Sequence, residues 1–444
     1  MTDKLTRDDI IERVRKAGVV GAGGGGFPTH VKLDLNADNL IANGAECEPL
    51  IATDRHLMET YAKEIIDGLR IVKQVVDAKN VYVALKKKYK KAVEEIKRNL
   101  GMNSDIEMFL LEDYYPAGDE HELVYDITGK TVPEGGIPPD AGSVVLNINT
   151  VLNVFFAVKH SKTVCKRWLT VAGEVQEPYI SEVPVGVSVR ELVEKAKPSI
   201  SDYRIMVGGA IMGHVMQEDH PVTKLCSGII VLPSDHPVIN KQNISYSVHK
   251  KRGSSVCDQC FDCTIVCPRN LLGHELSPHI AMRRLFISQA DSDFHFTNAY
   301  LCSDCGLCNM FACPMELSPR DIYRRIKIRL KEDGVPNPHK NSDLKVHPER
   351  YFRRVNNERL MERVGLKKYE KDKIGEKTIE AKKAKINLKQ HAGERSLPVV
   401  QRDQRVVQGE LIAEISGDYL GSRIHASIEG VVTDITEDFI MIRA

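Results

Sequence analysis

The sequence of 444 residues has no apolar run that approaches the roughly eighteen residues a helix needs to cross a bilayer. Its N-terminus, MTDKLTRDDIIERVRKAG, alternates charged with apolar residues, whereas a signal peptide has an unbroken apolar core. The formal net charge is only +1, which argues against a general nucleic-acid binder. These absences predict a cytoplasmic protein with no transmembrane segment and no nucleic-acid partner.

Two familiar kinds of active-site pattern are missing as well. The fifteen histidines show no metal-ligand or triad spacing, so no side chain stands out as a catalytic acid or base. The glycine-rich stretch Val19–Lys32 is not closed by the Gly-Lys-Ser or Gly-Lys-Thr of a P-loop. Gly21, Gly23 and Gly26 fit the letters of the dinucleotide-binding pattern, but a helix-like segment precedes them where a strand is required. Alone, the glycines are compatible with cofactor binding and with a flexible turn.

Cysteine, by contrast, is concentrated in one short segment. Eight of the eleven cysteines lie between Cys257 and Cys313, which in a chain without an export signal indicates metal ligation rather than disulfides. CDQCFDCTIVCP has the C-x2-C-x2-C-x3-C-P spacing of bacterial ferredoxins, and CSDCGLCNMFACP repeats it with one extra residue. Zinc sites take two cysteines from each of two separated knuckles, so this spacing indicates iron-sulfur clusters instead.

In such paired motifs, three close cysteines bind one cluster and the fourth, displaced along the chain, binds the other. We therefore predict two 4Fe-4S clusters. The first is assigned to Cys257, Cys260, Cys263 and Cys313. The second is assigned to Cys302, Cys305, Cys308 and Cys267.

Helix-like and strand-like segments alternate in the first part of the chain. Residues 7–18 and 58–78 have the pattern of helices, and residues 80–86 and 142–148 have the pattern of strands. This alternation predicts an α/β domain over residues 1–160.

The rest of the chain divides by composition, so that we expect a multidomain α/β and α+β protein. Short strands around one helix, 189–196, predict an α+β module over residues 161–245. The cysteines define a helical, ferredoxin-like two-cluster domain over residues 246–325. Residues 326–390 have an excess of Lys and Arg over Asp and Glu and no continuous apolar stripe, which predicts a basic, solvated helical linker. Short strands punctuated by glycine predict a small β-domain over residues 391–444.

Four motifs give the glycine stretch a more specific interpretation. GAGGGGFPTHVK is followed by NGAECEP, then by YPAGDE at Tyr115–Glu120 and by NINT at Asn147–Thr150. In this order the motifs resemble the flavin site of the 51 kDa NADH-binding subunit of respiratory complex I and of RnfC, the related subunit of the Rnf electron-transfer complex. The resemblance implies a domain that binds FMN and NADH over residues 1–160.

The same resemblance implies the residues of the site. FMN would contact residues of all four motifs, with Lys32 near its phosphate: Gly21, Gly23, Lys32, Asn43, Glu46, Tyr115, Gly118, Asp119, Asn147 and Thr150. Three further residues would contact the nicotinamide nucleotide: Phe27, Glu48 and Glu120. The sequence departs from the complex I subunit at Ala45, where that subunit has Asp, and at Ile137, where a second aromatic would help to stack adenine. We expect the backbone at Gly23 to lie against the flavin, so that a β-carbon there would enter the flavin's space, and a left-handed backbone angle at Gly23 would add strain to such a substitution.

The resemblance continues beyond the flavin domain. The segment from LTVAGEV to PVTK and GIIVLP resembles the soluble-ligand-binding β-grasp module of RnfC, and VVQGELIAEISGDYLGSRIHASIEGVV resembles its barrel-sandwich module. Here the barrel-sandwich module comes last, an order similar to that of the PduS-type cobalamin reductases. The resemblance implies an NADH-dependent oxidoreductase in which electrons pass from NADH to FMN, to the two clusters and to a corrinoid.

Two other functions remain open from the sequence. An RnfC-like electron-entry subunit would pass electrons to a protein such as a ferredoxin, a reductase or a membrane complex. A redox relay or scaffold would not turn over NADH at all. The expected partner is a corrinoid or a corrinoid-handling protein such as an adenosyltransferase, or else a redox protein, and a homo-oligomer stays open. A location inside a bacterial microcompartment, or at a membrane through a partner, is compatible with the cytoplasmic prediction.

Overall fold

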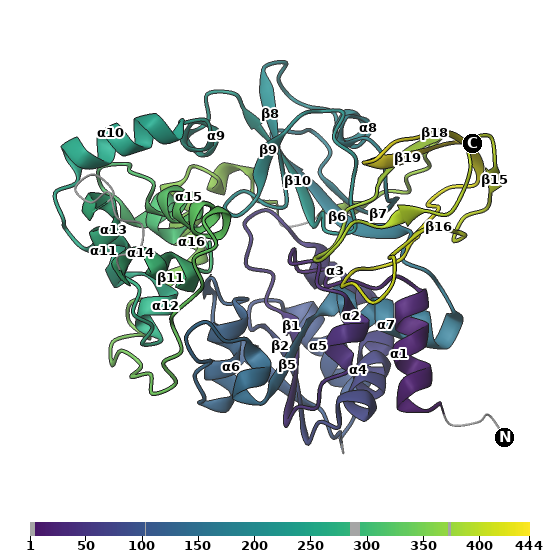
Figure 1. The fold of residues 1–444 in the computed structure, drawn as a ribbon, viewed down its shortest axis with the longest axis horizontal. Coiled ribbons are helices and arrows are strands. Elements are labelled where there is room, and N and C mark those ends of the chain that lie inside the picture. The colour runs from purple at the N-terminus through teal and green to yellow at the C-terminus, as the bar shows by residue number, and fades with distance from the viewer. Residues whose placement is uncertain (1–4, 103, 285–293, 372–373) are drawn as a thin grey trace.

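The computed structural model describes residues 5–102, 104–284, 294–371 and 374–444 (Figure 1). The N-terminal domain lies at the bottom of that view and the second module at the top, with the cysteine-rich segment at the left and the C-terminal strands at the right. Within the described residues, no helix combines the length and the apolar character needed to span a membrane.

The N-terminal domain is built around a parallel sheet in the order β3-β2-β1-β5. Its strands are β1 Asn39–Gly44, β2 Asn80–Lys86, β3 Glu107–Leu111 and β5 Ser143–Asn147. Its helices are α1 Arg7–Lys16, α2 Thr29–Leu33, α3 Thr53–Thr60, α4 Ala62–Val76, α5 Lys90–Leu100, α6 Glu120–Thr128 and α7 Ile148–His160. The predicted helix 58–78 is interrupted at Tyr61, whose extended φ of −118° separates α3 from α4.

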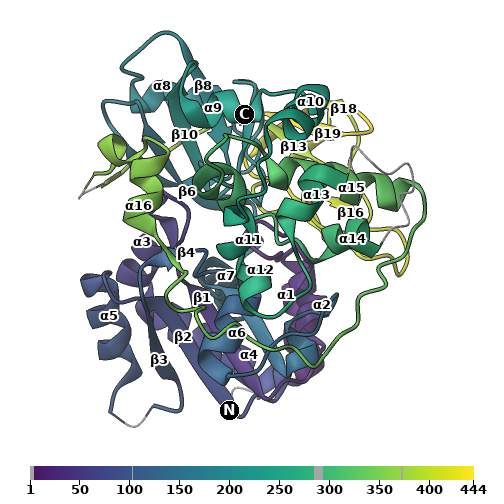
Figure 2. The ribbon, with the colours of Figure 1, turned by 90° about the vertical axis from the view of Figure 1, so that its left-hand side faces the viewer.

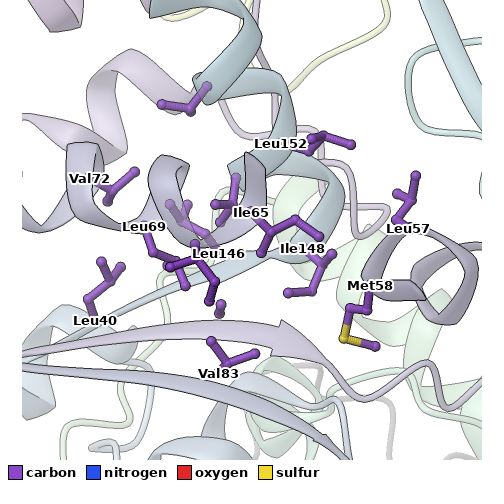
Figure 3. Packing of buried hydrophobic residues seen from close by; sticks show 14 of the residues in the cluster. Leu40, Leu57, Met58, Ile65, Leu69, Val72, Val83, Leu146, Ile148 and Leu152 are labelled. Atoms are coloured by element: carbon purple, nitrogen blue, oxygen red, sulfur yellow. The ribbon is translucent and has the colours of Figure 1, made fainter. Parts of the chain in front are cut away.

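Alternate residues of the central strands face two different apolar cores. In Figure 3, Leu40 of β1 and Val83 of β2 project toward Ile65 and Leu69 of α4. The intervening Ile41 belongs to a second core with residues of α6. Because successive side chains of a strand point to opposite faces, the sheet is covered on both sides, and ligand-binding groups are left to project from its carboxyl edge.

The second module contains a mixed sheet in the order β12-β7-β6-β10-β8-β9. Its strands are β6 Lys166–Gly173, β7 Tyr179–Pro184, β8 Tyr203–Val207, β9 His214–Met216, β10 Gly228–Pro233 and β12 Gly375–Glu376. β6 and β10 pair in parallel, whereas β8 and β7 pair antiparallel with their neighbours β10 and β6. The helix predicted at 189–196 is α8 Val189–Ala196, which begins at an N-cap on Ser188. The β-grasp identity of this module stays a prediction.

Short helices make up the cysteine-rich segment in the described residues. They are α9 Pro237–Gln242, α10 Tyr246–Val256, α11 Asp262–Ile265, α12 Pro268–Leu271, α13 Pro278–Arg284, α14 Phe294–Thr297 and α15 Pro319–Glu332, with a 3₁₀ turn at Asn298–Leu301 and a π turn at Cys308–Ala312. α15 packs Ile322, Tyr323 and Ile326 into the same apolar cluster as Cys267 and Leu301.

Residues 326–390 differ from the helical linker that their composition predicts. After α15 ends, the described chain is mostly non-helical until α16 Asn357–Arg363, and in Figure 2 this green segment crosses the N-terminal domain beside α6 on its way to α16. Three short pieces become strands of other sheets: β11 Val355–Asn356 pairs with β4 Tyr114–Tyr115, β12 with β7, and β13 Lys383–Asn387 with the C-terminal β19.

The basic residues of this segment explain the difference. Arg350 is buried, with Nη2 2.5 Å from Glu122 Oε2 and Nη1 2.8 Å from Asp126 Oδ1 of α6. Arg354 also pairs with Asp126. These arginines form ion pairs with carboxylates of α6 in the N-terminal domain. The segment is therefore packed against that domain and is not a solvated linker.

The C-terminal domain consists of two antiparallel sheets on one apolar core. One has the order β13-β19-β18-β15, with β15 Arg405–Val406, β18 Gly430–Ile435 and β19 Phe439–Arg443. The other has the order β14-β16-β17, with β14 Leu397–Pro398, β16 Leu411–Glu414 and β17 Ile424–His425. The strand-rich domain predicted here is therefore present, and it begins earlier than expected because β13 belongs to it.

Candidate flavin and iron-sulfur site

The four predicted flavin motifs meet at the carboxyl edge of the parallel sheet. Asn43, at the end of β1, donates from Nδ2 to the carbonyl oxygen of Gly118 across 2.9 Å. The backbone N–H of Ala22 donates to Thr150 Oγ1, also at 2.9 Å. The second motif is thus bonded to the third, and the first to the fourth, although about 75 and 128 residues separate the partners along the chain.

The glycine loop is a tight turn between α1 and α2. Gly21 N donates to the Phe27 carbonyl oxygen at 2.9 Å, and Gly26 N donates back to that of Gly21 at 3.2 Å. Gly24 and Gly26 have φ of +102° and +62°, a region that residues with a β-carbon rarely adopt. The positive φ that we considered at Gly23 is absent; Gly24 and Gly26 have it instead, and glycine adopts it without steric strain.

The glycines approach three different parts of the molecule. A β-carbon at Gly26 would lie 2.9 Å from a methyl of Leu225 and 3.2 Å from Cα of His391, so this end of the loop packs against the second module and the C-terminal domain. One at Gly23 would lie 3.5 Å from Cβ of Asn147, an ordinary contact. Beside Gly24 and Gly25, no described atom lies within 4 Å of such a β-carbon. The open face of the loop is therefore at these two glycines.

Three of the predicted ligand contacts, Lys32, Glu120 and Phe27, are partly exposed. Lys32 Nζ lies 3.1 Å from Glu120 Oε1, and the ring of Phe27 is 39% exposed. Asp119, which precedes Glu120, caps α6 by accepting from the N–H of His121 at 2.9 Å. Its other oxygen is 3.1 Å from Arg269 Nη2 of the cysteine-rich segment, so Asp119 ties the flavin motif to that segment.

Two buried carboxyl groups lie next to each other behind the loop. Glu46 Oε2 accepts from the backbone N–H of Asp54 at 2.5 Å, and Asn147 Nδ2 donates to Asp54 Oδ2 at 2.6 Å. Burial, and then the charge of Asp54, raise the pKa of Glu46, and burial also raises the pKa of Asp54. The neighbouring charge of Asp54 and the burial of both groups therefore disfavour ionising the two carboxyl groups together.

Asp54 was not among the residues that the sequence predicted, and neither was Arg167. Arg167 is buried in β6 and donates from Nε to the Cys226 carbonyl oxygen and from Nη2 to that of Ala22, each at 2.7 Å. Its Nη1 has no hydrogen-bond partner among the described residues. An arginine just before an apolar strand carries no sequence signal for this role, because its partners come from distant segments.

Lys224 joins the start of the glycine loop to the other domains. Its Nζ donates to the carbonyl oxygens of Gly18 at 2.7 Å and Arg423 at 2.8 Å. Burial lowers the pKa of Lys224 to about 7. The loop is therefore held by three domains at once.

Glu48, whose contact with the nicotinamide nucleotide stays a prediction, is bonded to the second module. Its two carboxylate oxygens accept from the backbone N–H groups of Ile211 at 3.0 Å and Met212 at 2.9 Å, in the loop after β8. Burial raises its pKa to about 7, while the two N–H groups oppose that shift. Both oxygens are engaged by the second module, which gives Glu48 a role in joining domains.

Tyr115 connects the flavin motifs to the cysteines. Its hydroxyl donates to the carbonyl oxygen of Cys305 at 2.7 Å and lies 3.4 Å from Glu48 Oε1. Tyr115 is almost completely buried, so this contact closes the boundary between the N-terminal domain and the cysteine-rich segment.

The eight cysteines surround two cavities. One, of about 320 Å³, is lined by Cys257, Cys260, Cys263 and Cys313. The other, of about 350 Å³, is lined by Cys267, Cys302, Cys305 and Cys308, with Cys263 also at its wall. Among the described residues, no three His, Cys, Asp or Glu side chains converge closely enough to hold a single metal ion. The sulfur ligands thus enclose volumes, which is the arrangement that a multi-iron cluster requires.

Three family models match parts of the chain. Residues 14–156 match the Nuo51 FMN-binding domain, residues 256–318 the 4Fe-4S dicluster domain, and residues 364–443 the RnfC barrel sandwich hybrid domain. These matches confirm the multidomain fold and the flavin and iron-sulfur cofactors that the motifs predict.

Full-length relatives agree with these matches. The chain is 37% identical over 441 residues to the cobalamin reductase PduS of Citrobacter freundii, covering 98% of this chain and 96% of the relative. It is 37% identical over 443 residues to that of Salmonella typhimurium, covering 99% and 97%. It is 33% identical over 277 residues to a subunit of the Na⁺-translocating ferredoxin:NAD⁺ oxidoreductase complex of Acetobacterium woodii, covering 61% and 60%.

A solved structure shares the fold at lower sequence identity. The NAD⁺-reducing NiFe-hydrogenase in its air-oxidized state aligns with a TM-score of 0.50 and 19% identity, over 80% of this chain and 67% of the hydrogenase chain.

Proposed function

The chain belongs to the family of the PduS cobalamin reductases, and on this basis we propose that it is an NADH-dependent oxidoreductase that reduces a corrinoid. The observation that carries the proposal is the bond between Tyr115 and Cys305, because it brings the flavin motifs into contact with the second set of cysteines. A site that accepts a hydride and a site that passes single electrons are thus neighbours in one chain.

The residues at hand fit both cofactors. FMN, when bound, supplies the conversion between the two-electron donor NADH and one-electron carriers. It would be held at the open face beside Gly24 and Gly25, with Lys32 for its phosphate and Asn43 and Asn147 at the carboxyl edge of the sheet. The two clusters would be held by the cysteines that line the two cavities.

Side chains of the protein itself would position the cofactor and the nucleotide and would supply protons. The raised pKa of Glu46, caused by burial and then by the charge of Asp54, makes this carboxyl group a candidate proton donor to a group that changes charge on reduction. Arg167 fixes Ala22 and holds a positive charge against that pair. The exposed ring of Phe27, with Glu120 nearby on Lys32, offers a surface for the nicotinamide nucleotide.

The reaction balances at two corrinoids per nucleotide. NADH gives up two electrons and one proton as it becomes NAD⁺, and each cob(III)alamin takes one electron to become cob(II)alamin. A further single electron would give cob(I)alamin, the form that adenosylation uses. Free corrinoid, or corrinoid on an adenosyltransferase, is the proposed partner, and the cytoplasm or a bacterial microcompartment is the proposed location.

A second candidate function follows from the relative in Acetobacterium woodii. An electron-entry subunit would have the same NADH-to-cluster route and would deliver its electrons to a protein. Only the acceptor differs between the two proposals, so the acceptor is what the experiment must identify.

Anaerobic stopped-flow spectroscopy of the reconstituted protein tests the proposal. NADH should bleach the flavin and then the clusters, and hydroxocobalamin added next should be reduced as the clusters reoxidise. Reduction of a ferredoxin without reduction of hydroxocobalamin would favour the second candidate. Clusters that are reduced by dithionite but not by NADH would support the third possibility, a redox relay that does not oxidise NADH.

A further inference from the structure

A further cavity, lined in part by residues that follow β1 and end β2, shares no lining residue with the glycine loop or with the two cysteine cavities. It measures about 830 Å³ including its open mouth, and none of residues 19–32 lines it. Its walls come from residues within 46–55 and 86–89 of the N-terminal domain, from Ala172 and Pro178 of the second module, and from residues within 357–371 and Ile374 of the segment that follows α15. The cavity thus lies where three parts of the chain meet, a common position for ligand sites.

Positive charge gathers at this cavity. Arg55, Lys86, Lys88 and Lys371 line it. Lys86 is 1% exposed at its side chain, and a single carboxylate, Asp113, lies 3.0 Å from Lys86 Nζ and 2.7 Å from Lys88 Nζ. Burial lowers the pKa of Lys86, so the positive charge at the cavity comes mainly from Arg55, Lys88 and Lys371.

The acidic residues of the lining do not cancel this positive charge. The carboxyl groups of Glu46 and Glu48 have raised pKa values because they are buried, and both accept hydrogen bonds from backbone N–H groups. Glu370 is paired with Lys367, 2.7 Å away. The cavity therefore favours a ligand that carries a negative group.

The floor of the cavity is fixed and partly aromatic. Tyr89 donates from its hydroxyl to the Glu46 carbonyl oxygen at 3.1 Å, and the Arg55 guanidinium lies 5.7 Å from its ring centroid. Glu46 and Leu50 have φ of +37° and +66°, a strained conformation for residues with a β-carbon. Strain of this kind persists where the surrounding structure enforces a shape, and it clusters at binding sites.

The apolar wall of the cavity is continuous with the second set of cysteines. Ile51, Met361 and Tyr369 line the cavity and belong to the same packed cluster as Tyr115, with Cys305 packed against it. Tyr115 in turn bonds to Cys305. A ligand in the cavity is therefore separated from that cysteine loop by packed side chains and not by solvent.

We propose that this cavity binds the corrinoid acceptor, with the phosphodiester of the corrinoid's nucleotide loop against Arg55, Lys88 and Lys371. The proposal rests on the function proposed above and adds the place where the acceptor binds. A corrinoid is larger than the drug-sized ligands that cavities of about 300–1,000 Å³ enclose, so part of it lies in the cavity and part over the mouth. One electron is transferred to each bound corrinoid, and the cobalt is reduced from the trivalent to the divalent state.

The test measures binding separately from turnover. Equilibrium dialysis of the reconstituted holoenzyme with hydroxocobalamin, in the absence of NADH, gives a dissociation constant for wild type and for the double variant R55A/K88A. Losing two charge-assisted contacts should raise that constant about tenfold or more. The matched control is Lys87→Ala, which removes the neighbouring exposed lysine that does not line the cavity, and it should bind like wild type.

Cobinamide, a corrinoid without the nucleotide loop and its phosphate, gives the second arm. It should bind wild type more weakly than hydroxocobalamin does, and R55A/K88A should change its binding little. NADH-driven reduction of ferricyanide, FMN content and iron content should stay at wild-type values in the double variant, because neither Arg55 nor Lys88 is among the residues predicted to contact the flavin, the nucleotide or the clusters.

Three results overturn the assignment. They are equal hydroxocobalamin binding by wild type and R55A/K88A, an equal loss for cobinamide, and displacement of hydroxocobalamin by NADH, which would make the cavity a nucleotide site. If wild-type protein reduces hydroxocobalamin in any of these cases, the proposed function stands and only the proposed binding site is refuted. If wild-type protein neither binds nor reduces hydroxocobalamin, both the proposed function and the proposed site are refuted.

Discussion

The hydroxyl of Tyr115 donates a hydrogen bond to the carbonyl oxygen of Cys305 across 2.7 Å, at a point where both groups are shielded from solvent. The two residues are 190 positions apart, one in a flavin motif and the other in a cysteine motif. The bond fixes the orientation of the two halves of the proposed electron route relative to each other, and this has a direct test.

Tyr115→Phe removes that bond and leaves the ring in place. A buried carbonyl without a partner costs about 1–3 kcal/mol, so the free energy of unfolding should fall by about that amount. Reduction of the flavin by NADH should keep its rate, whereas the following reduction of the clusters should slow severalfold. Stopped-flow traces at the flavin and cluster bands separate the two steps, and equal slowing of both would contradict a role at the boundary.

Cys267 tests the sharing of cysteines between the two motifs. It belongs by sequence to the first motif but lines the cavity of Cys302, Cys305 and Cys308. Cys267→Ser should therefore damage the second cluster and leave the first, as read from the two electron paramagnetic resonance signals of dithionite-reduced protein. Cys260→Ser is the matched variant and should do the reverse, because Cys260 lines only the first of these two cavities. Loss of the same signal in both variants would refute the assignment.

Glu48 predicts how stability depends on pH. Its pKa is raised from 4.5 to about 7 in the folded protein, mainly by burial, so the folded state holds a proton that the unfolded state has released. The contribution of this group to stability is then fully present below about pH 4.5 and is lost as the pH rises to about 7, on the order of 3 kcal/mol in all. Urea unfolding at pH 5 and pH 7.5 measures the difference.

Glu48→Gln supplies the comparison for that measurement. Glutamine cannot ionise, so the variant should lose less stability between the two pH values than wild type does. It should be less stable than wild type at pH 5, because its amide group cannot accept from both Ile211 and Met212. An identical pH dependence in the two proteins would show that Glu48 ionises normally.

Arg167 predicts a link between the second module and flavin binding. Arg167→Met keeps an unbranched apolar stem and removes the donors to Ala22 and Cys226. The glycine loop should loosen, so FMN content should fall at least severalfold while iron content stays near wild type. Arg190→Met, an exposed arginine of α8 in the same module, is the control and should retain its flavin. Normal FMN affinity in Arg167→Met would confine Arg167 to packing.

Local patterns predicted much of the architecture, and long-range contacts account for most of what they missed. The helix at 189–196 and the strand at 80–86 follow from apolar periodicity, and the cysteine spacing locates the cluster segment, because each is contained in a few consecutive residues. Asp54 and Arg167 could not be recognised, since their roles arise from partners such as Asn147 and Ala22 in other segments.

The basic segment 326–390 is a second case in which contacts with distant residues could not be predicted from the local sequence. An excess of lysine and arginine predicts a solvated helix, yet Arg350 is buried against Glu122 of a helix some 228 residues earlier. The carboxylates that neutralise it cannot be found from its neighbours in the sequence. Charge patterning describes a segment alone, whereas burial depends on what it packs against.

Gly25 tests whether the glycine loop is open because a flavin lies there. Its φ is outside the left-handed region, and a β-carbon added to it meets no described atom within 4 Å. In flavin-free protein, Gly25→Ala should therefore be neutral or stabilise the fold by about 0.4–1 kcal/mol, since alanine restricts the unfolded chain. If the open face holds FMN, the same methyl group lies in the flavin's space, and FMN affinity should fall at least tenfold.

Gly23→Val should also lose FMN, because its branches extend beyond the 3.5 Å contact with Asn147. Thermal unfolding without flavin and fluorescence titration with FMN measure the two effects. Iron content and reduction of the clusters by dithionite should remain normal in both variants, because the cysteines lie in a separate segment. A Gly25→Ala protein that binds FMN like wild type would place the flavin away from this face of the loop, and the glycines would then serve only the contacts at Leu225 and His391.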